Sequence, residues 1–240
     1  MVHLSRSDIE KIAEPIIQKY KQFYVPERHL FYNVDPLELA ALLGYSVVYA
    51  NITKTGSILG QTSSCPIWTT ILDDSMNEIF FFLDGKTILI EKRLLQPNLI
   101  GRKNFTIAHE LAHLILNQHF SESSESTNQI LCDYRRSEQP KKKITDWYEW
   151  QADALAAALL LPLEVVQDYM FLFGLGKKMK VLSRKYSRNK YDSFCIMAES
   201  LQVSKTALAY RMEQFGLLER NLLIREALDR RGVKAHGRAN

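Results

Sequence analysis

Hydrophobic positions near the start of the chain recur with the period of a helix. The spacing predicts an amphipathic helix over residues 5–24, capped by Ser7 or Asp8, from the apolar positions Ile9, Ile12, Ile16, Ile17 and Tyr20. A second helix is predicted from Asp35 to Gly44, because Asp is a good N-cap, Pro36 fits the first turn and Gly ends helices.

The pattern then changes to short runs of β-branched and aromatic residues. These runs predict strands over 46–50, 66–72, 78–83 and 87–91, with turn-forming residues between them. The first 91 residues therefore predict two helices followed by a small sheet.

Two strongly apolar helices are predicted next, over about 102–117 and 146–161, the second ended by Pro162. The polar residues 121–146 lack apolar periodicity, which predicts a surface loop or an insertion with a short ordered piece inside it. Residues 163–231 are helical in pattern. This order of elements predicts an α+β protein with a first domain over 1–175, including the insertion, and a helical C-terminal segment over 176–240.

Composition agrees with a globular protein, since 46% of the 240 residues are hydrophobic and 24% are charged. The longest uncharged apolar run, Ala154–Leu163, is about half of the roughly 20 residues that a membrane span needs. Acidic residues at positions 8, 10 and 14 interrupt any apolar leader. The cysteines Cys65, Cys132 and Cys195 form no CxxC pair, so we expect reduced thiols and a cytoplasmic protein.

Charge is distributed unevenly along the chain. Residues 171–240 hold 15 Lys and Arg against 6 Asp and Glu, whereas the first 170 residues hold 16 against 21. A basic end favours binding to nucleic acid or to an acidic partner, and on charge alone it is equally typical of a solvated helical surface.

The first apolar helix contains the motif His109-Glu110-Leu111-Ala112-His113. Because residues four apart lie one turn apart on the same helix face, both imidazoles can reach a single ion. Glu110 lies about 100° from His109 around the helix axis, where it can approach a metal-bound water as a general base. The alternative, two incidental surface histidines, fits poorly with the apolar neighbours of the pair.

A catalytic zinc site takes three protein ligands, and two residues are candidates for the third. His119 would complete an HExxH-x5-H pattern, but Leu116 stands where that pattern has a Gly that turns the chain back. Glu149 lies on the second apolar helix, one turn before Asp153, where a carboxylate is costly unless it meets a cation. Asp153 is placed to accept the N–H of a ligating histidine. An alternative is that the acidic residues lie near the N-terminus of their own helix, where negative charge is favourable. This would explain Glu149 but not Asp153.

Two stretches resemble a known family. Residues 102–116, RKNFTIAHELAHLIL, resemble the active helix of the ImmA/IrrE family of zinc metallo-endopeptidases. Residues 149–162, EWQADALAAALLLP, resemble that family's second motif, which supplies the third ligand and closes with an LLxP break. The Glu-x3-Asp spacing is also that of gluzincins. The polar insertion at 121–146 departs from the family pattern.

The resemblance implies a zincin-like core, with a small twisted sheet and two metal-bearing helices. By position it implies zinc ligands His109, His113 and Glu149, the catalytic base Glu110, and Asp153 as the residue that orients a ligand. It also implies site-specific cleavage of a regulatory protein, typically a DNA-binding repressor, in a bacterial, phage or mobile-element setting. The candidates for stabilising the oxyanion, by chemistry only, are Tyr134, Tyr148, Tyr186 and Tyr210.

The basic end of the chain has the residue types of a helix-turn-helix over 196–213, with Gln202 at the position usually held by a turn Gly. One interpretation is DNA contact through Lys205, Tyr210 and Arg211. The other is a helix pair that packs on the peptidase body. With a structural or inactive metal site, the alternative function is a regulatory module that binds DNA or a protein.

Overall fold

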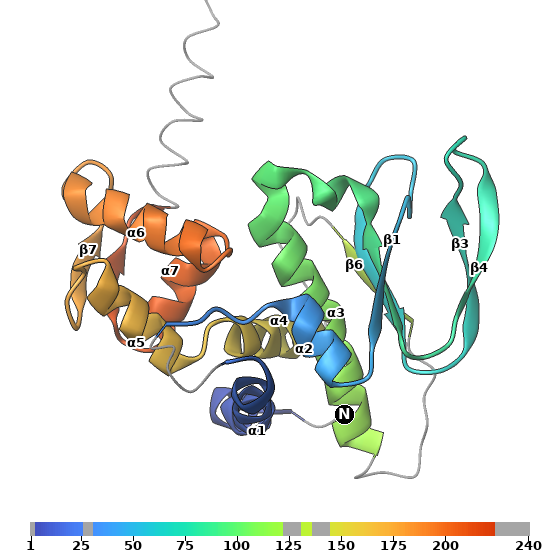
Figure 1. Ribbon diagram of the computed structural model, residues 1–240, viewed down its shortest axis with the longest axis horizontal. Coiled ribbons are helices and arrows are strands. Elements are labelled where there is room, and N and C mark those ends of the chain that lie inside the picture. Colours follow the sequence, from blue (N-terminus) through green and yellow to red (C-terminus); the bar gives the residue numbers. More distant parts are fainter. Residues whose placement is uncertain (1–2, 26–30, 122–130, 136–144, 224–240) are drawn as a thin grey trace, which may run out of the picture. The chain divides into compact units, whose positions relative to one another are not determined.

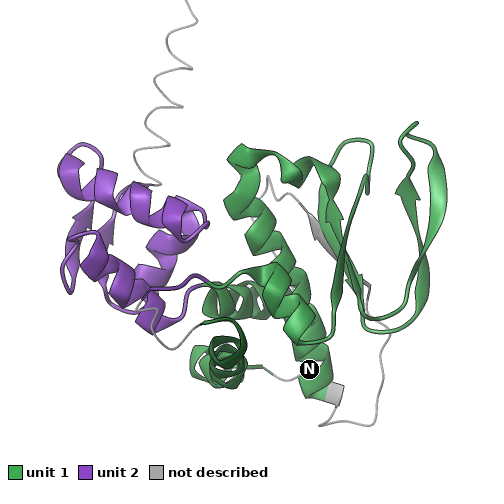
Figure 2. Cartoon of the chain, viewed as in Figure 1, with its two compact units in different colours: residues 1–29, 34–160 green, residues 30–33, 161–240 purple. Residues whose placement is uncertain are grey.

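The structure is a computed structural model that describes residues 3–25, 31–121, 131–135 and 145–223. It is a mixed α+β protein (Figure 1) whose internal contacts divide the chain into two compact units (Figure 2). Unit 1 comprises residues 1–29 and 34–160, and unit 2 comprises residues 30–33 and 161–240. The predicted domain boundary at residue 175 stays a prediction.

Unit 1 opens with the two helices that the apolar spacing predicts. The first, α1 (Arg6–Tyr24), begins with a capping box in which the Ser5 hydroxyl accepts from the Asp8 N–H and the Asp8 carboxylate accepts from the Ser5 N–H. The cap is therefore Ser5, and the prediction of Ser7 or Asp8 was wrong, because Asp8 acts from the third helical position. The second, α2 (Pro36–Leu42), is capped by Asp35 as predicted.

A four-stranded sheet follows, in the order β1-β5-β2-β6. Strand β1 (Ser46–Ala50) runs parallel to β5 (Thr87–Glu91), which pairs antiparallel with β2 (Ile58–Ser63). The last strand, β6 (Leu131–Arg135), pairs antiparallel with β2 and is an ordered piece of the predicted insertion. Residues 122–130 and 136–144 of that insertion lie outside the described residues.

The sheet is covered on both faces by parts of unit 1, as Figure 1 shows. Helix α3 (Ile100–Ser121) covers one face, and a ribbon of β3 (Ile67–Leu72) and β4 (Glu78–Leu83) covers the other. The ribbon packs through an apolar cluster that joins it to β1 and β5, formed by Ala50, Ile52, Ile71, Leu83 and Leu89. Because β2 is covered on both faces, its polar residues are buried, which is why sequence patterning missed this strand.

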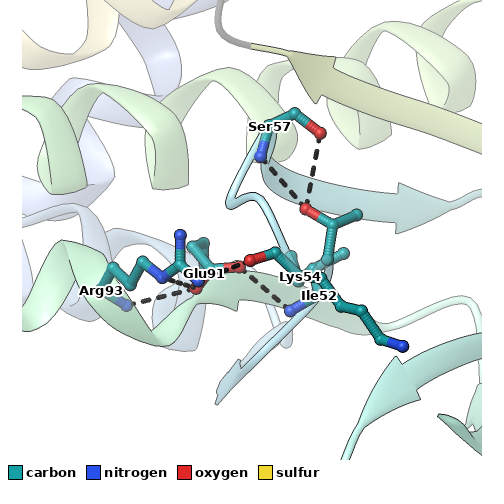
Figure 3. A network of polar contacts seen from close by, with 6 residues as sticks. Ile52, Lys54, Ser57, Glu91 and Arg93 are labelled. Carbon is teal, nitrogen blue, oxygen red and sulfur yellow. Dashed lines mark hydrogen bonds and ion pairs between the residues drawn. The ribbon is translucent and has the colours of Figure 1, made fainter. Parts of the chain in front are cut away.

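A polar network fixes the turn between β1 and β2 (Figure 3). The Glu91 carboxylate at the end of β5 is 1% exposed and accepts from the Ile52 N–H at 3.0 Å. Arg93 lies 3.8 Å from the same carboxylate and donates to the Lys54 carbonyl at 2.8 Å. The 3-10 turns η1 (Lys92–Leu95) and η2 (Pro97–Leu99) then lead into α3. The network therefore joins the sheet to the start of this helix.

Helix α4 (Thr145–Leu160) packs against both α3 and α1 and ends before Pro162, as predicted. Its Gln151 side chain is fully buried and accepts from the Leu4 N–H at 2.9 Å, which ties the start of the chain to this helix. Within the described residues, no helix alone is long and apolar enough to span a membrane. Helix α4 and the following α5 (Leu163–Leu172) meet the length and composition test only as a bent pair.

Unit 2 differs from the prediction of helices throughout 163–231. It contains α5, α6 (Arg188–Ser200) and α7 (Lys205–Gln214), but also β7 (Met179–Leu182) and β8 (Leu218–Asn221), which pair in parallel. These four-residue strands lie next to glycines with positive φ at Gly176 and Gly216, and are too short to give a periodic signal. Residues 224–240 lie outside the described part.

The α6–α7 pair corrects one predicted contact. Arg211 is 1% exposed, donates to the Leu161 carbonyl at 2.9 Å and stacks over Phe215. It is therefore a core residue of unit 2. Of the two interpretations of this segment, the one with DNA contact through Arg211 has no support here, because the guanidinium has protein partners inside the unit. Gln202 adopts φ of +53° in the turn between the helices, where the helix-turn-helix pattern usually has Gly.

Candidate metal centre

The two histidines of the HExxH motif lie on the face of α3 that meets α4. Both side chains are fully buried, and their Nε2 atoms are 3.0 Å apart. Their rings are nearly perpendicular, with centroids 4.6 Å apart. The four-residue spacing on one helix thus places two imidazole nitrogens close enough to bind the same ion.

Helix α4 brings a carboxylate to the same point. Glu149 Oε2 lies 3.3 Å from His109 Nε2, and Oε1 lies 3.5 Å from His113 Nε2. The Glu149 side chain is one-quarter exposed, whereas the two histidines are not exposed at all. The two histidines are therefore enclosed, and Glu149 is the member of the three that is partly exposed.

Asp153 lies one turn further along α4, on the other side of the His109 ring. Its Oδ1 is 2.9 Å from His109 Nδ1, so the carboxylate accepts the N–H of this nitrogen and Nε2 faces His113 and Glu149. Burial alone would lower the pKa of His109, but hydrogen bonds to Asp153 and Glu149 raise the pKa to about 9. The orienting role expected for Asp153 stays a prediction, and this hydrogen bond is the contact that such a role requires.

The donor set fits a zinc ion. Two imidazole nitrogens and a carboxylate oxygen lie within 4.8 Å of one another. Ligand atoms at ~2.1 Å from one tetrahedral ion are about 3.4 Å apart. The two histidine Nε2 atoms are 3.0 Å apart, and each lies 3.3–3.5 Å from one of the two Glu149 oxygens. Two histidines and one glutamate form a three-residue ligand set, which is typical of a catalytic rather than a structural site.

Glu110 lies beside this cluster, against the backbone of β2. It is fully buried, and a Cβ added to Gly60 would lie 2.7 Å from Glu110 Oε1 and 2.8 Å from Thr106 Cγ2. Only glycine therefore allows the strand to approach the carboxylate so closely. Gly60 was not among the residues predicted for the site, although a glycine inside a strand is a signal of close backbone approach.

The sequence model of the IrrE N-terminal-like domain, peptidase family M78, matches residues 67–213. The chain belongs to this family. The match covers α3 and α4, and thus every residue of the cluster. It begins in β3, so Gly60 lies before the matched region. No match was found among the curated proteins.

Membership in family M78 assigns the chain to a peptidase family, and the cluster can hold a metal ion. The other candidate ligand, His119, is exposed on the last turn of α3 and is not part of the cluster. It lies within the helix rather than beyond its end, because α3 continues to Ser121.

Four tyrosines were candidates for stabilising the oxyanion. Among the described side chains of unit 1, Tyr148 is the one candidate that lies beside the His109, His113 and Glu149 cluster. Its ring packs against His113 with centroids 4.8 Å apart, and its hydroxyl donates to Asn117 Oδ1 at 2.8 Å. Asn117 follows His113 by one helical turn, so Tyr148 and Asn117 together hold the His113 ring. Tyr186 and Tyr210 belong to unit 2, and the side chain of Tyr134 lies outside the described part.

Gly60→Ala should separate metal binding from catalysis. The added methyl must displace Glu110 or Thr106, so we expect the free energy of unfolding to fall by ~1–3 kcal/mol. Metal content should stay at the wild-type level, while kcat for peptide hydrolysis falls about 100-fold because Glu110, the residue expected to act as general base, is displaced. Thr70→Ala, an exposed change on β3, is the control. An unchanged kcat in Gly60→Ala would contradict the proposed position of Glu110.

Metal binding should release a proton from His109. A pKa of about 9 means that this imidazole is protonated at pH 7 before metal binds, and only its neutral form is a ligand. Zinc titrations by calorimetry in two buffers of different ionisation enthalpy should show about one proton released at pH 7 and affinity that rises as pH approaches 9. Asp153→Asn should reduce the release. Zinc affinity independent of pH between 6 and 9 would contradict this account.

Proposed function

We propose that this protein is a zinc-dependent endopeptidase with a zincin-like core. The observation that carries the proposal is the convergence of His109, His113 and Glu149 beside the buried carboxylate of Glu110. Family membership supports peptide-bond hydrolysis as the reaction.

His109, His113 and Glu149 would hold the zinc ion. Bound there, zinc supplies a Lewis acid that polarises the scissile carbonyl and lowers the pKa of a water molecule. Glu110 takes the proton of the attacking water and passes it to the leaving amine. Its burial against β2 restricts the movement of this carboxylate.

The other residues of the cluster act on the ligands. Asp153 fixes the tautomer of His109, so that Nδ1 carries the proton and Nε2 offers its lone pair. Tyr148, held by Asn117, limits rotation of the His113 ring. Both contacts reduce the reorganisation that metal binding requires.

The substrate we propose is a regulatory protein of the repressor type, cleaved at a specific bond. Among the described strands, β6 has one neighbour, β2, so a substrate strand can pair with its other edge. Main-chain pairing gives affinity with little sequence preference, and side-chain pockets would then decide which bond is cut.

The alternative function, a regulatory DNA-binding module, is favoured by one feature of unit 2. Helices α6 and α7 are joined by a turn of four residues, and Lys205 and Tyr210 are exposed on α7. Arg211 is excluded from such a contact by its burial. In this alternative the metal has a structural role and Glu110 has none.

Glu110→Gln tests the peptidase proposal. The amide cannot accept the proton of the water, so cleavage should fall by at least about 1,000-fold, while zinc content and unfolding temperature stay close to wild type. The substrates to assay are the purified DNA-binding regulators encoded beside this protein, with cleavage products read by mass spectrometry.

Glu14→Gln, an exposed change on α1, is the matched control and should retain full activity. If the wild type holds zinc but is as inactive towards these proteins as Glu110→Gln, the result would favour the binding-module alternative.

A further inference from the structure

The outer face of the β3–β4 ribbon carries large aromatic side chains that remain exposed in the structure. In the antiparallel register Trp68 lies opposite Phe82 and Thr70 lies opposite Phe80. Trp68 is 65% exposed, Phe80 80% and Phe82 46%, and the Trp68 and Phe82 rings have centroids 5.1 Å apart. We call these four residues the aromatic ribbon face.

The opposite face of the ribbon accounts for its stability. Side chains alternate along each strand, and the inner residues Ile71 and Leu83 are buried against β1 and β5. The aromatic rings of the outer face lie outside that inner cluster, and the Trp68 and Phe82 rings pair across the two strands. A strand pair with such an exposed surface is prone to association. An aromatic patch of this kind is typical of a surface that a binding partner covers.

The charges around the aromatic ribbon face are acidic. Glu78 lies on the same side of β4 as Phe80 and Phe82, two residues before Phe80. Asp73 and Asp74 form the turn of the ribbon, and Asp84 follows β4, whereas residues 64–87 contain one basic residue, Lys86. Lys92 pairs with Asp74 at 3.0 Å, so Asp73, Glu78 and Asp84 carry the acidic charge of this frame. Backbone hydrogen bonds from Asn77 and Lys86 lower the pKa values of Asp73 and Asp84, so both carboxylates stay ionised.

This acidic frame decides between classes of partner. A second copy seated face to face would bring equal charges together, since both surfaces of a two-fold interface are the same. Nucleic acid and anionic lipid carry phosphates, which Glu78 and the aspartates repel. Arg and Lys side chains, in contrast, pack their aliphatic stems and cationic heads on aromatic rings and pair with carboxylates.

We propose that the aromatic ribbon face docks an Arg- and Lys-rich segment of a protein partner. The ribbon covers the face of the sheet opposite α3, so this segment is separate from any peptide at the metal centre (Figure 1). Docking therefore requires neither metal nor Glu110, and it stands or falls independently of the peptidase activity.

Fluorescence anisotropy with the full-length protein tests the proposal. The probe is a labelled ten-residue peptide of alternating Arg and Leu, and the reference is the same design with Glu in place of Arg. We expect micromolar binding of the Arg peptide and none of the Glu peptide. Phe80→Ser should weaken the Arg peptide at least about tenfold, the size of one lost hot-spot contact.

Matched variants make the result specific. Phe171→Ser removes a ring that is 81% exposed on α5 in unit 2 and should leave binding unchanged. Trp68→Ser should reproduce the loss, Glu78→Lys should weaken binding, and Glu110→Gln should bind as wild type does. Circular dichroism checks that each variant is folded.

Three outcomes would overturn the proposal. Equal binding of the two peptides would remove the charge argument. Equal losses in Phe80→Ser and Phe171→Ser would remove the ribbon as the site. Dimerisation of the wild type in sedimentation, abolished by Phe80→Ser, would assign the face to a second copy of the chain.

Discussion

The structure of unit 1 depends on compensating buried polar groups inside a pair of apolar helices. His109, Glu110 and His113 have no exposed surface, and their neighbours on α3 are largely Ala, Leu and Ile. Burying such groups without partners costs several kcal/mol, more than an ordinary domain can lose. Glu149 and Asp153 approach from α4 and supply charge opposite to that of a protonated His109 at hydrogen-bonding distance, whereas the Glu110 carboxylate has the same sign as theirs. The helix pair is therefore built around the cluster.

The rest of unit 1 holds these two helices at the required separation. The sheet supports α3 from one side, and its approach is close because Gly60 has no side chain to displace Glu110. Helix α1 packs against α4, and the Leu4 N–H is bonded to the buried Gln151. The buried Glu91 and its partners fix the segment that leads into α3. Each of these contacts limits the movement of one ligand relative to another.

Much of the cluster could be predicted from sequence because local spacing determines it. Four-residue steps on a helix place His109 with His113 and Glu149 with Asp153, whatever the tertiary fold. That the two pairs meet followed from chemistry, since acidic residues among Trp and Ala need a cation. What spacing did not reveal was the support: Gly60 in a polar strand, and Tyr148 with Asn117 behind His113. These contacts join segments that no local pattern connects.

The errors have physical causes of the same kind. Strand β2 has polar residues but is buried on both faces, so neither alternation nor an apolar run marks it. Arg211 stands on a short helix in a basic segment, where exposure is the ordinary expectation, yet the Leu161 carbonyl and Phe215 hold it inside unit 2. Strands β7 and β8 depend on pairing across about 40 residues, which helical periodicity in the intervening segment conceals.

The most direct test of the account is the metal content of the purified protein, measured by mass spectrometry on the wild type and on Glu149→Ala. If the three side chains form one site, the wild type holds about one zinc per chain and Glu149→Ala loses most of it, while Glu14→Ala keeps it. Full zinc occupancy in Glu149→Ala, or none in the wild type after reconstitution, would contradict the three-ligand centre on which the account rests.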